Sequence, residues 1–196
     1  MIPAPPPRLD TSSFTLRPWS ASDAPALASV LAASDAHLRA WTPWVVDGRV
    51  PGQTLAERLE RHEQAFESGT EWVYGIFNPT GNVLGGCGLY PRVGNGAIEI
   101  GYWLSLAQTG RGLATAATAQ LTRLAFAAKD IDRIEIRCAT DNVASGRVPE
   151  RLGYHIQEQV AAAPNSGHAE TLVVWEMTRA EWSTFDPERW PIGGRV

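Results

Sequence analysis

One stretch of the chain, Ala97–Leu121 (AIEIGYWLSLAQTGRGLATAATAQL), constrains the fold more than any other. Its opening part alternates in the manner of a strand, with apolar side chains at Ile98, Ile100, Tyr102 and Leu104. A tight Gly110-Arg111-Gly112 turn follows, and an alanine-rich segment with helical spacing of its apolar residues runs from about Gly112 to Lys129. The stretch therefore predicts a strand, a glycine turn and a helix in direct succession.

This turn has the chemistry of an anion site. Unpaired N–H groups at a helix N-terminus point outward and the helix dipole favours negative charge, while Arg111 adds a formal positive charge. Turn geometry alone would also explain the glycines. A P-loop is excluded, because Leu113-Ala114 stands where Lys-Ser/Thr is required. A dinucleotide fold is disfavoured, because Asp130 and Asp132 precede the next strand instead of ending it.

Helices and strands alternate through the rest of the chain. The patterns predict strands at Phe14–Trp19, Trp72–Phe77, Val83–Tyr90, Ile134–Cys138 and Thr171–Met177. Helices are predicted after Asp23, at His37–Trp44, after the capping box at Thr54, from Asp141-Asn142 to Gly153, and shortly after Arg179. The two strands before Ala97 form a hairpin, so three consecutive strands are expected to be antiparallel.

Length and composition predict one domain at residues 11–180, with a disordered proline-rich tail at 1–10 and a C-terminal tail at 181–196. The net charge of −4 comes without a basic run, which argues against nucleic acid. With no leader or membrane-length apolar run, we expect a cytoplasmic protein, monomeric or homodimeric, with no membrane association. Cys87 and Cys138 lie in apolar runs without a metal-ligand spacing, so buried thiols and no metal are expected.

Two motifs carry a family resemblance. The run IEIGYWLSLAQTGRGLAT resembles the acyl-CoA-binding motif of the GCN5-related N-acetyltransferases (GNAT), and Asp141–Tyr154 resembles the second motif of that family. The segments LRPW and LRAWTPW resemble the RimJ/RimL-like branch, the ribosomal-protein N-terminal acetyltransferases. The resemblance covers about Phe14–Met177. It implies an α/β fold with a mixed, mostly antiparallel sheet of six or seven strands, splayed at the cofactor, with helices on both faces.

The resemblance also implies direct acetyl transfer from acetyl-CoA, as co-substrate, to an amine acceptor. The pantetheine arm would pair with main chain from Tyr102 onward, and an N–H near Trp103 or Leu104 would polarise the thioester carbonyl. The pyrophosphate would lie on the turn and the first turn of the helix, and Asn142 would contact the pantetheine arm. The residues expected around the pyrophosphate are Thr109, Gly110, Arg111, Gly112, Leu113, Ala114 and Thr115. Thr109 departs from the family pattern, which has Gln or Arg at that position.

Two residues are candidates for proton transfer. Ser145 stands where the family has a serine near the sulfur and is the candidate general acid; alternatively it bonds its own backbone in the first helical turn. Glu99 is the candidate base, beside the point of transfer; alternatively it orients an amine or pairs with an arginine.

The acceptor side is less defined by the sequence. Trp41 and Trp44 are expected to wall the acceptor cleft, or else to be packing contacts, and His168 and Glu170 are substrate-side candidates. A peptide or protein N-terminal α-amine is the acceptor that the RimJ/RimL-like branch suggests. A small-molecule amine, a longer acyl-CoA and a non-catalytic acyl-CoA-binding domain remain open alternatives.

Overall fold

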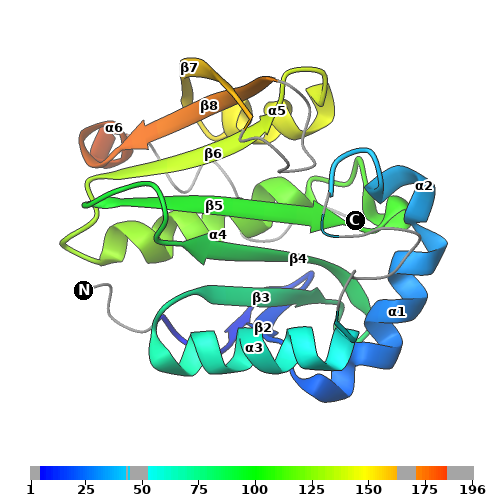
Figure 1. The fold of residues 1–196 in the computed structure, drawn as a ribbon. Coiled ribbons are helices and arrows are strands. Elements are labelled where there is room, and N and C mark those ends of the chain that lie inside the picture. The colour runs from blue at the N-terminus through cyan, green and yellow to red at the C-terminus, as the bar shows by residue number, and fades with distance from the viewer. Residues whose placement is uncertain (1–4, 43, 45–52, 163–170, 185–196) are drawn as a thin grey trace.

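The computed structural model describes residues 5–42, 44, 53–162 and 171–184. Within these ranges the chain forms one sheet of eight strands in the order β1-β2-β3-β4-β5-β6-β8-β7 (Figure 1). The strands are β1 (Leu9–Asp10), β2 (Thr15–Pro18), β3 (Trp72–Phe77), β4 (Val83–Tyr90), β5 (Ala97–Leu104), β6 (Arg133–Ala139), β7 (His155–Ala161) and β8 (Thr171–Thr178). The helices are η1 (Ala21–Asp23), α1 (Ala24–Ala33), α2 (Asp35–Leu38), α3 (Leu55–Ser68), η2 (Leu106–Gln108), α4 (Leu113–Ala127), α5 (Val143–Arg151) and α6 (Arg179–Thr184).

The sheet is antiparallel except at its centre, where β5 and β6 run parallel. On one side, β1 to β5 pair in sequence order, and the predicted hairpin of β3 and β4 is confirmed with its strand limits. On the other side, β6, β8 and β7 form an antiparallel group of their own. The helix α4 connects these two groups, because it leads from β5 to β6.

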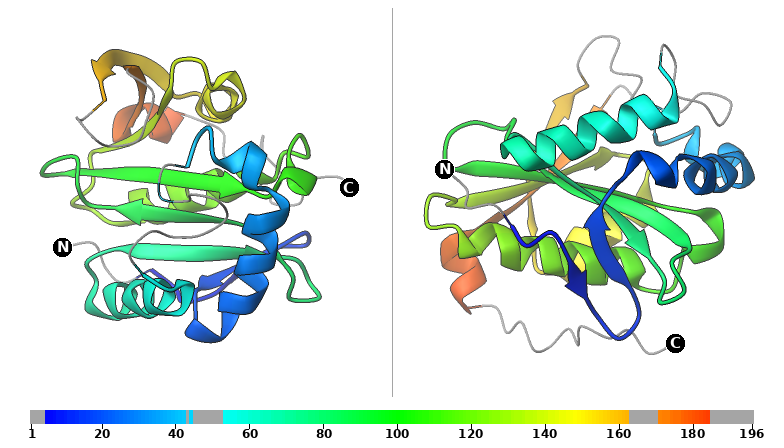
Figure 2. Two further views of the ribbon diagram at one scale, coloured as in Figure 1. Left: turned by 45° about the vertical axis from the view of Figure 1, so that its right-hand side comes forward. Right: turned by 90° about the horizontal axis from the view of Figure 1, so that it is seen from below.

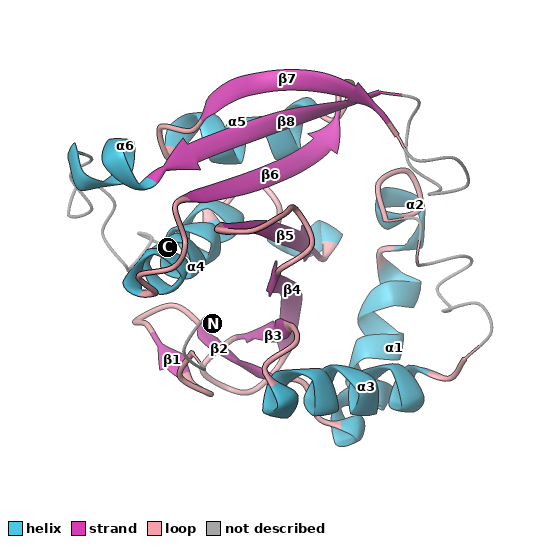
Figure 3. Cartoon of the chain, turned by 60° about the vertical axis from the view of Figure 1, so that its left-hand side comes forward, coloured by secondary structure: helices cyan, strands magenta, loops and turns pink. Residues whose placement is uncertain are grey.

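Helices cover both faces of the sheet, as expected. Figure 2 shows α3 and α4 on opposite sides of the strands, and Figure 3 shows α1 and α2 on the same side of the molecule as α3. The larger core includes residues of α4, α5 and the central strands, such as Leu121, Ile98 and Ile134, each fully buried. A smaller core beneath α1 and α3 includes Leu31 and Leu59.

Local sequence explains where these helices begin and end. The Thr54 hydroxyl accepts a bond from the Glu57 N–H while the Glu57 carboxylate accepts one from the Thr54 N–H, so the predicted capping box starts α3. Gly69, with φ of 71°, ends that helix. The segment before α1 differs from the expectation: Ser20 caps the short η1, and Asp23 completes that capping box with its side chain instead of capping α1.

Three expectations are corrected. The sheet has eight strands instead of six or seven. The ordered fold reaches into the stretch assigned to the tail at 1–10, since Leu9–Asp10 pairs with β2. The helix expected at His37–Trp44 is α2, which begins earlier, at Asp35, and ends at Leu38; beyond it, the Thr42 N–H still donates to the Leu38 carbonyl.

The cysteines match their prediction, since Cys87 and Cys138 are both buried thiols without a disulfide. Among the described helices, none combines the length and the apolar character that crossing a membrane requires. The described residues also contain no group of three or more His, Cys, Asp and Glu side chains that could hold a metal ion.

Candidate active site

The central parallel pair comes apart partway along its length. β5 and β6 are registered only at Ala97 with Arg133, Ile98 with Ile134, and Glu99 with Glu135. Beyond Glu99, β5 continues to Leu104 in register with β4 alone, while β6 continues to Ala139 in register with β8. Among the described strands, the edge of β5 that faces β6 therefore has no partner in this stretch, and an extended molecule could pair with it.

The glycine turn lies at the far end of the same strand. Gly110 and Gly112 have φ of 74° and 76°, and a Cβ at either position would have no neighbouring atom within 4 Å. Gly112 is the N-cap of α4, and no side chain among the described residues caps this helix. The first amides of α4 are thus open to a ligand, which is the arrangement that binds phosphate at helix N-termini. Arg111 is exposed beside them.

Thr109 does not disturb this turn. Its backbone is extended, and its hydroxyl donates to the Leu106 carbonyl at 2.9 Å, which fixes the loop immediately before Gly110. The family side chain that Thr109 replaces is therefore not needed to shape the loop in this chain. On the other side of the loop, the Leu106 N–H donates to the Ser34 hydroxyl at 3.2 Å, which ties the start of η2 to the end of α1.

The start of α5 approaches β5 across the gap. Asn142 caps α5 by accepting from the Ser145 N–H at 3.1 Å. The Tyr102 hydroxyl donates to the Ser145 carbonyl at 2.9 Å, and the Ser145 hydroxyl donates to the Tyr102 oxygen at 3.2 Å. Burial raises the pKa of Tyr102, so the phenol stays protonated at neutral pH. Ser145 is thus held by a side chain of β5 and not only by its own backbone.

Glu99 lies on the other face of β5, at the last position that is paired with β6. The residue is 8% exposed. Both of its carboxylate oxygens accept from Arg92, at 2.6 Å from Nη2 and 3.0 Å from Nε. The arginine-paired alternative for Glu99 is therefore present in the structure. Its neighbour across the strand pair, Glu135, is bonded in the same way by Arg133 and Arg137.

Two aromatic rings cover the sheet beside Glu99, and glycines make room for them. A Cβ on Gly86 would be 2.6 Å from Trp103 Nε1, and a Cβ on Gly88 would be 2.8 Å from the Tyr90 oxygen. A Cβ on Gly101 would be 3.2 Å from Tyr90 Cε2. Both rings therefore lie flat against this face of the sheet, and Tyr90 is directly opposite Glu99 in the strand register. They form the floor of the acceptor side.

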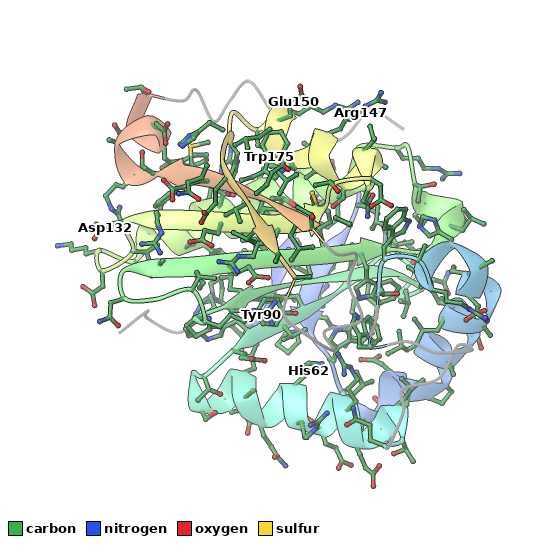
Figure 4. All side chains as sticks on the ribbon, turned by 45° about the horizontal axis from the view of Figure 1, so that its top comes forward. His62, Tyr90, Asp132, Arg147, Glu150 and Trp175 are labelled. Carbon is green, nitrogen blue, oxygen red and sulfur yellow. The ribbon has the colours of Figure 1, made fainter. Side chains whose placement is uncertain are left out.

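Helix α3 and the segment after α2 provide the wall above this floor. The Trp44 ring meets Trp103 edge-on with centroids 5.9 Å apart, and the Arg58 guanidinium carbon is 4.5 Å from the centre of the Trp44 ring. The Arg92 guanidinium stacks on Tyr90 at the same distance of 4.5 Å. His62, also on α3, points toward the sheet that holds Tyr90 (Figure 4).

The electrostatics of this wall are positive. Burial, together with Arg58 and Arg61, lowers the pKa of His62 to about 4, so this imidazole is neutral at pH 7. Burial also lowers the pKa of Arg58 from its ordinary value. Burial raises the pKa of Tyr90 to about 12, although the neighbouring Arg92 and Arg58 act in the opposite direction.

One cleft of about 1110 Å³ joins the two sides of β5. On the helix-terminus side it is lined by Thr109, Gly110, Gly112, Leu113, Ala114, Thr115, Asn142 and Ser145. On the acceptor side it is lined by Trp41, Trp44, Arg58, His62, Tyr90, Arg92, Glu99 and Trp103. Tyr102 and Leu104 also line it, so the structure gathers these predicted residues around one space, with the exposed Arg111 beside the turn. His168 and Glu170 lie outside the described residues.

The lining residues that were not predicted include Arg58, His62, Tyr90 and Arg92. One signal was available in the sequence, since Gly86, Gly88 and Gly101 leave one face of two neighbouring strands without side chains. A large aromatic residue is then needed to cover that face. A second signal was the helical spacing of α3, which places the polar residues Arg58 and His62 on the same face as the apolar residues Leu55, Leu59 and Phe66.

Comparison with known proteins identifies relatives of this chain. The family model described as an acetyltransferase (GNAT) domain matches residues 13–155. YdaF of Bacillus subtilis (strain 168), provisionally named a ribosomal N-acetyltransferase, is 34% identical over 90 residues, which are 45% of this chain and 49% of YdaF. The matches to the curated relatives span about half of those proteins.

Solved structures share the fold over nearly the whole chain. Mycobacterium smegmatis RimJ in complex with CoA-disulfide has a TM-score of 0.74 at 22% identity, covering 90% of this chain and 87% of that one. The ribosomal-protein-S5-alanine acetyltransferase of Vibrio fischeri also has a TM-score of 0.74, at 18% identity, covering 89% and 98%. At these identities the likeness concerns the fold.

Proposed function

This chain belongs to the acetyltransferase (GNAT) domain family, and on that premise we propose that it transfers the acetyl group of acetyl-CoA directly to a primary amine. One observation carries the proposal: the opening of β5 from β6 lies between an uncapped helix N-terminus and a lined acceptor cleft. A ligand extended along β5 could reach from the phosphate-binding amides to Glu99 without leaving this cleft.

The residues present fit acetyl-CoA. The amides at Gly110–Thr115 suit a pyrophosphate, because no side chain caps them and no atom lies where a glycine Cβ would be at Gly110 or Gly112. The unpaired edge of β5 from Tyr102 to Leu104 suits the amide groups of a pantetheine arm. Asn142 can add a side-chain amide to that contact. When bound, acetyl-CoA supplies the thioester whose carbonyl carbon the amine attacks.

Ser145 is our candidate for protonating the departing thiolate. Its hydroxyl now donates to the Tyr102 oxygen, so it must rotate to donate into the cleft. Tyr102 holds the Ser145 backbone by its second bond, which leaves the serine hydroxyl as the movable donor. A backbone N–H near Trp103 or Leu104 would polarise the carbonyl.

Glu99 is our candidate for receiving the amine proton, directly or through water. Its carboxylate is held by Arg92, which fixes its position. Such a held carboxylate also attracts and orients an ammonium group before it loses its proton. This role needs little basicity when the acceptor is a peptide α-amine, with an ordinary pKa near 8, compared with about 10.4 for lysine.

We propose a peptide N-terminal α-amine as the acceptor. The names of YdaF and of the Vibrio fischeri enzyme, which refer to ribosomal N-acetylation and to ribosomal protein S5, support this class. The test is thiol release from acetyl-CoA against a panel of short peptides, internal-lysine peptides, aminoglycosides and polyamines. Peptides with small N-terminal residues should be acetylated fastest. Turnover of aminoglycosides or polyamines alone would overturn this acceptor, and tight CoA binding without any transfer would indicate a non-catalytic binding domain.

A further inference from the structure

Counted over the residues that the structure describes, the acceptor side of the cleft has more cationic than anionic groups. The arginines that line it are Arg58, Arg61, Arg92 and Arg137, and the carboxylates are Glu71 and Glu99. Glu99 is already engaged by Arg92, and Arg137 is engaged by Glu135. Among the described residues, this leaves Arg58 and Arg61 facing the carboxylate of Glu71, and Arg61 also donates a hydrogen bond to Gln53 Oε1. A cleft that binds a simple cationic amine is expected to have more anionic than cationic side chains.

Arg58 is the group that most needs a partner. Its guanidinium is half-buried against Trp44, and within the described ranges no carboxylate lies within 4.0 Å of it and no hydrogen bond to it is found. The Glu71 carboxylate interacts with the Arg58 guanidinium only through longer-range electrostatic attraction, which raises the pKa of Arg58. A guanidinium has five N–H donors, and removing them from water without an acceptor is unfavourable. The cleft is the open side from which an acceptor could approach.

The surroundings of Arg58 suit a carboxylate. Arg92 stacks on Tyr90 and Arg58 stacks on Trp44, and all four residues line the same cleft. Arg92 bonds Glu99 through Nε and Nη2, which leaves its Nη1 donors available. Planar guanidinium groups bind carboxylates through paired N–H bonds. Burial and, after it, the positive charge of Arg58 and Arg61 lower the pKa of His62 in the same part of the cleft.

The position of this pocket relative to Glu99 sets the spacing of the acceptor. Tyr90 and Glu99 are directly opposite in the antiparallel register, so their Cβ atoms are about 5 Å apart. An amine at Glu99 and an anion above Tyr90 are then separated by roughly the length of one residue. A side chain at the second position of a peptide spans this distance.

We propose that the pocket formed by Arg58, Arg92, Trp44 and Tyr90 binds a carboxylate of the acceptor, and that the preferred acceptor is a peptide with an acidic residue next to its N-terminus. This proposal rests on the proposed function and names its substrate class. The aromatic rings contact the aliphatic part of the acidic side chain, and Glu99 receives the N-terminal amine.

The test compares two amidated hexapeptides that begin Ser-Glu or Ser-Gln and are otherwise identical. The native enzyme should acetylate the acidic peptide with a kcat/KM about tenfold higher, because a charged hydrogen bond is lost in the amide peptide. In Arg58→Gln this ratio should fall to within about twofold, and Arg58→Lys should retain part of it. Arg8→Gln is the charge-matched control, since Arg8 pairs with Asp10 at the surface and is not among the cleft residues; its ratio should not change.

The outcomes separate this proposal from the one it rests on. Equal acetylation of both peptides by the native enzyme overturns the carboxylate pocket and leaves N-acetylation standing. No acetylation of any amine overturns both. A preference that survives Arg58→Gln also overturns the pocket. As a second readout, the acidic peptide should raise the pKa of His62 in an NMR titration, while the amide peptide should not.

Free glutamate, assayed in parallel, distinguishes the source of the carboxylate. Like the acidic peptide, free glutamate carries an α-amine and a side-chain carboxylate, but it lacks the peptide backbone. A kcat/KM far below that of the Ser-Glu peptide is expected. Equal or greater turnover would overturn the peptide acceptor and assign the pocket to a small amino acid.

Discussion

The two sides of β5 bind their ligands in different ways. On the helix-terminus side, the groups offered are main-chain amides at a turn of consecutive residues, Gly110–Thr115, with glycine at the two left-handed positions. On the acceptor side, the groups offered are side chains that come from α3, β4, β5 and the segment after α2. A backbone site depends on local geometry, whereas a side-chain site depends on how distant segments pack. The backbone site should therefore be shared within a fold family, whereas the side-chain site should be specific to each member.

Replacing Gly112 with Asp should have the largest effect, because it breaks the backbone side alone. A carboxylate about 4 Å from a phosphate costs roughly 4 kcal/mol at an effective dielectric constant of 20, or about a thousandfold in affinity for CoA. Calorimetric titration with CoA measures this directly. Gly81→Asp is the matched control, because Gly81 also has a positive φ and open space around it but lies in the β3–β4 turn. If both variants bind CoA normally, the turn is not the phosphate site.

Ser145→Ala should lower kcat by about a hundredfold or more, the usual range for a lost general acid. CoA affinity should change little, because the N-cap bond from the Ser145 N–H to Asn142 remains. The rate of CoA thiol release, measured in stopped time points at saturating acetyl-CoA, gives kcat. Tyr102→Phe separates the serine from its partner: if Ser145 is the acid, this variant should lose less activity than Ser145→Ala. The reverse order would identify the tyrosine as the proton donor.

The same contrast explains what could be predicted from the sequence. The strand, turn and helix at Ala97–Leu121 carry their signals in consecutive residues, and their limits in the structure agree closely with the prediction. β7 was missed because its side chains are almost all exposed and show no alternation of apolar and polar residues. β1 was missed because two residues are too few for a pattern. In the site, the Arg92–Glu99 bond remained one of two alternatives, since only folding determines which arginine reaches the carboxylate.

Glu99→Gln tests the acceptor side. If the carboxylate receives the amine proton, kcat/KM should fall about a hundredfold. Arg92→Gln should produce a smaller loss, because the carboxylate remains but is no longer fixed. A normal rate in Glu99→Gln would show that the amine loses its proton to solvent or to another group.

His62 gives the smallest expected effect, on stability. Its folded pKa of about 4 is below the ordinary value of 6.5, so the unfolded chain binds a proton that the folded chain does not. The contribution of His62 to the free energy of unfolding is complete above pH 6.5 and is lost as the pH falls toward 4. For a partly exposed group the loss is about 1–2 kcal/mol. Urea unfolding at pH 7 and pH 4.5 measures the difference, which should shrink in His62→Gln but not in His37→Gln. An equal pH dependence in both variants would contradict the assigned burial of His62.

The most direct test of the account is whether the two sides of β5 form one continuous site. A conjugate that joins the sulfur of CoA through an acetyl spacer to the N-terminal amine of a Ser-Glu peptide would have to occupy both sides at once. The account predicts that it binds at least a hundredfold more tightly than CoA, because the second contact becomes intramolecular. Gly112→Asp and Arg58→Gln should each weaken it. An affinity equal to that of CoA would contradict the account, because the peptide would then have no place in the cleft beyond the opening of β5.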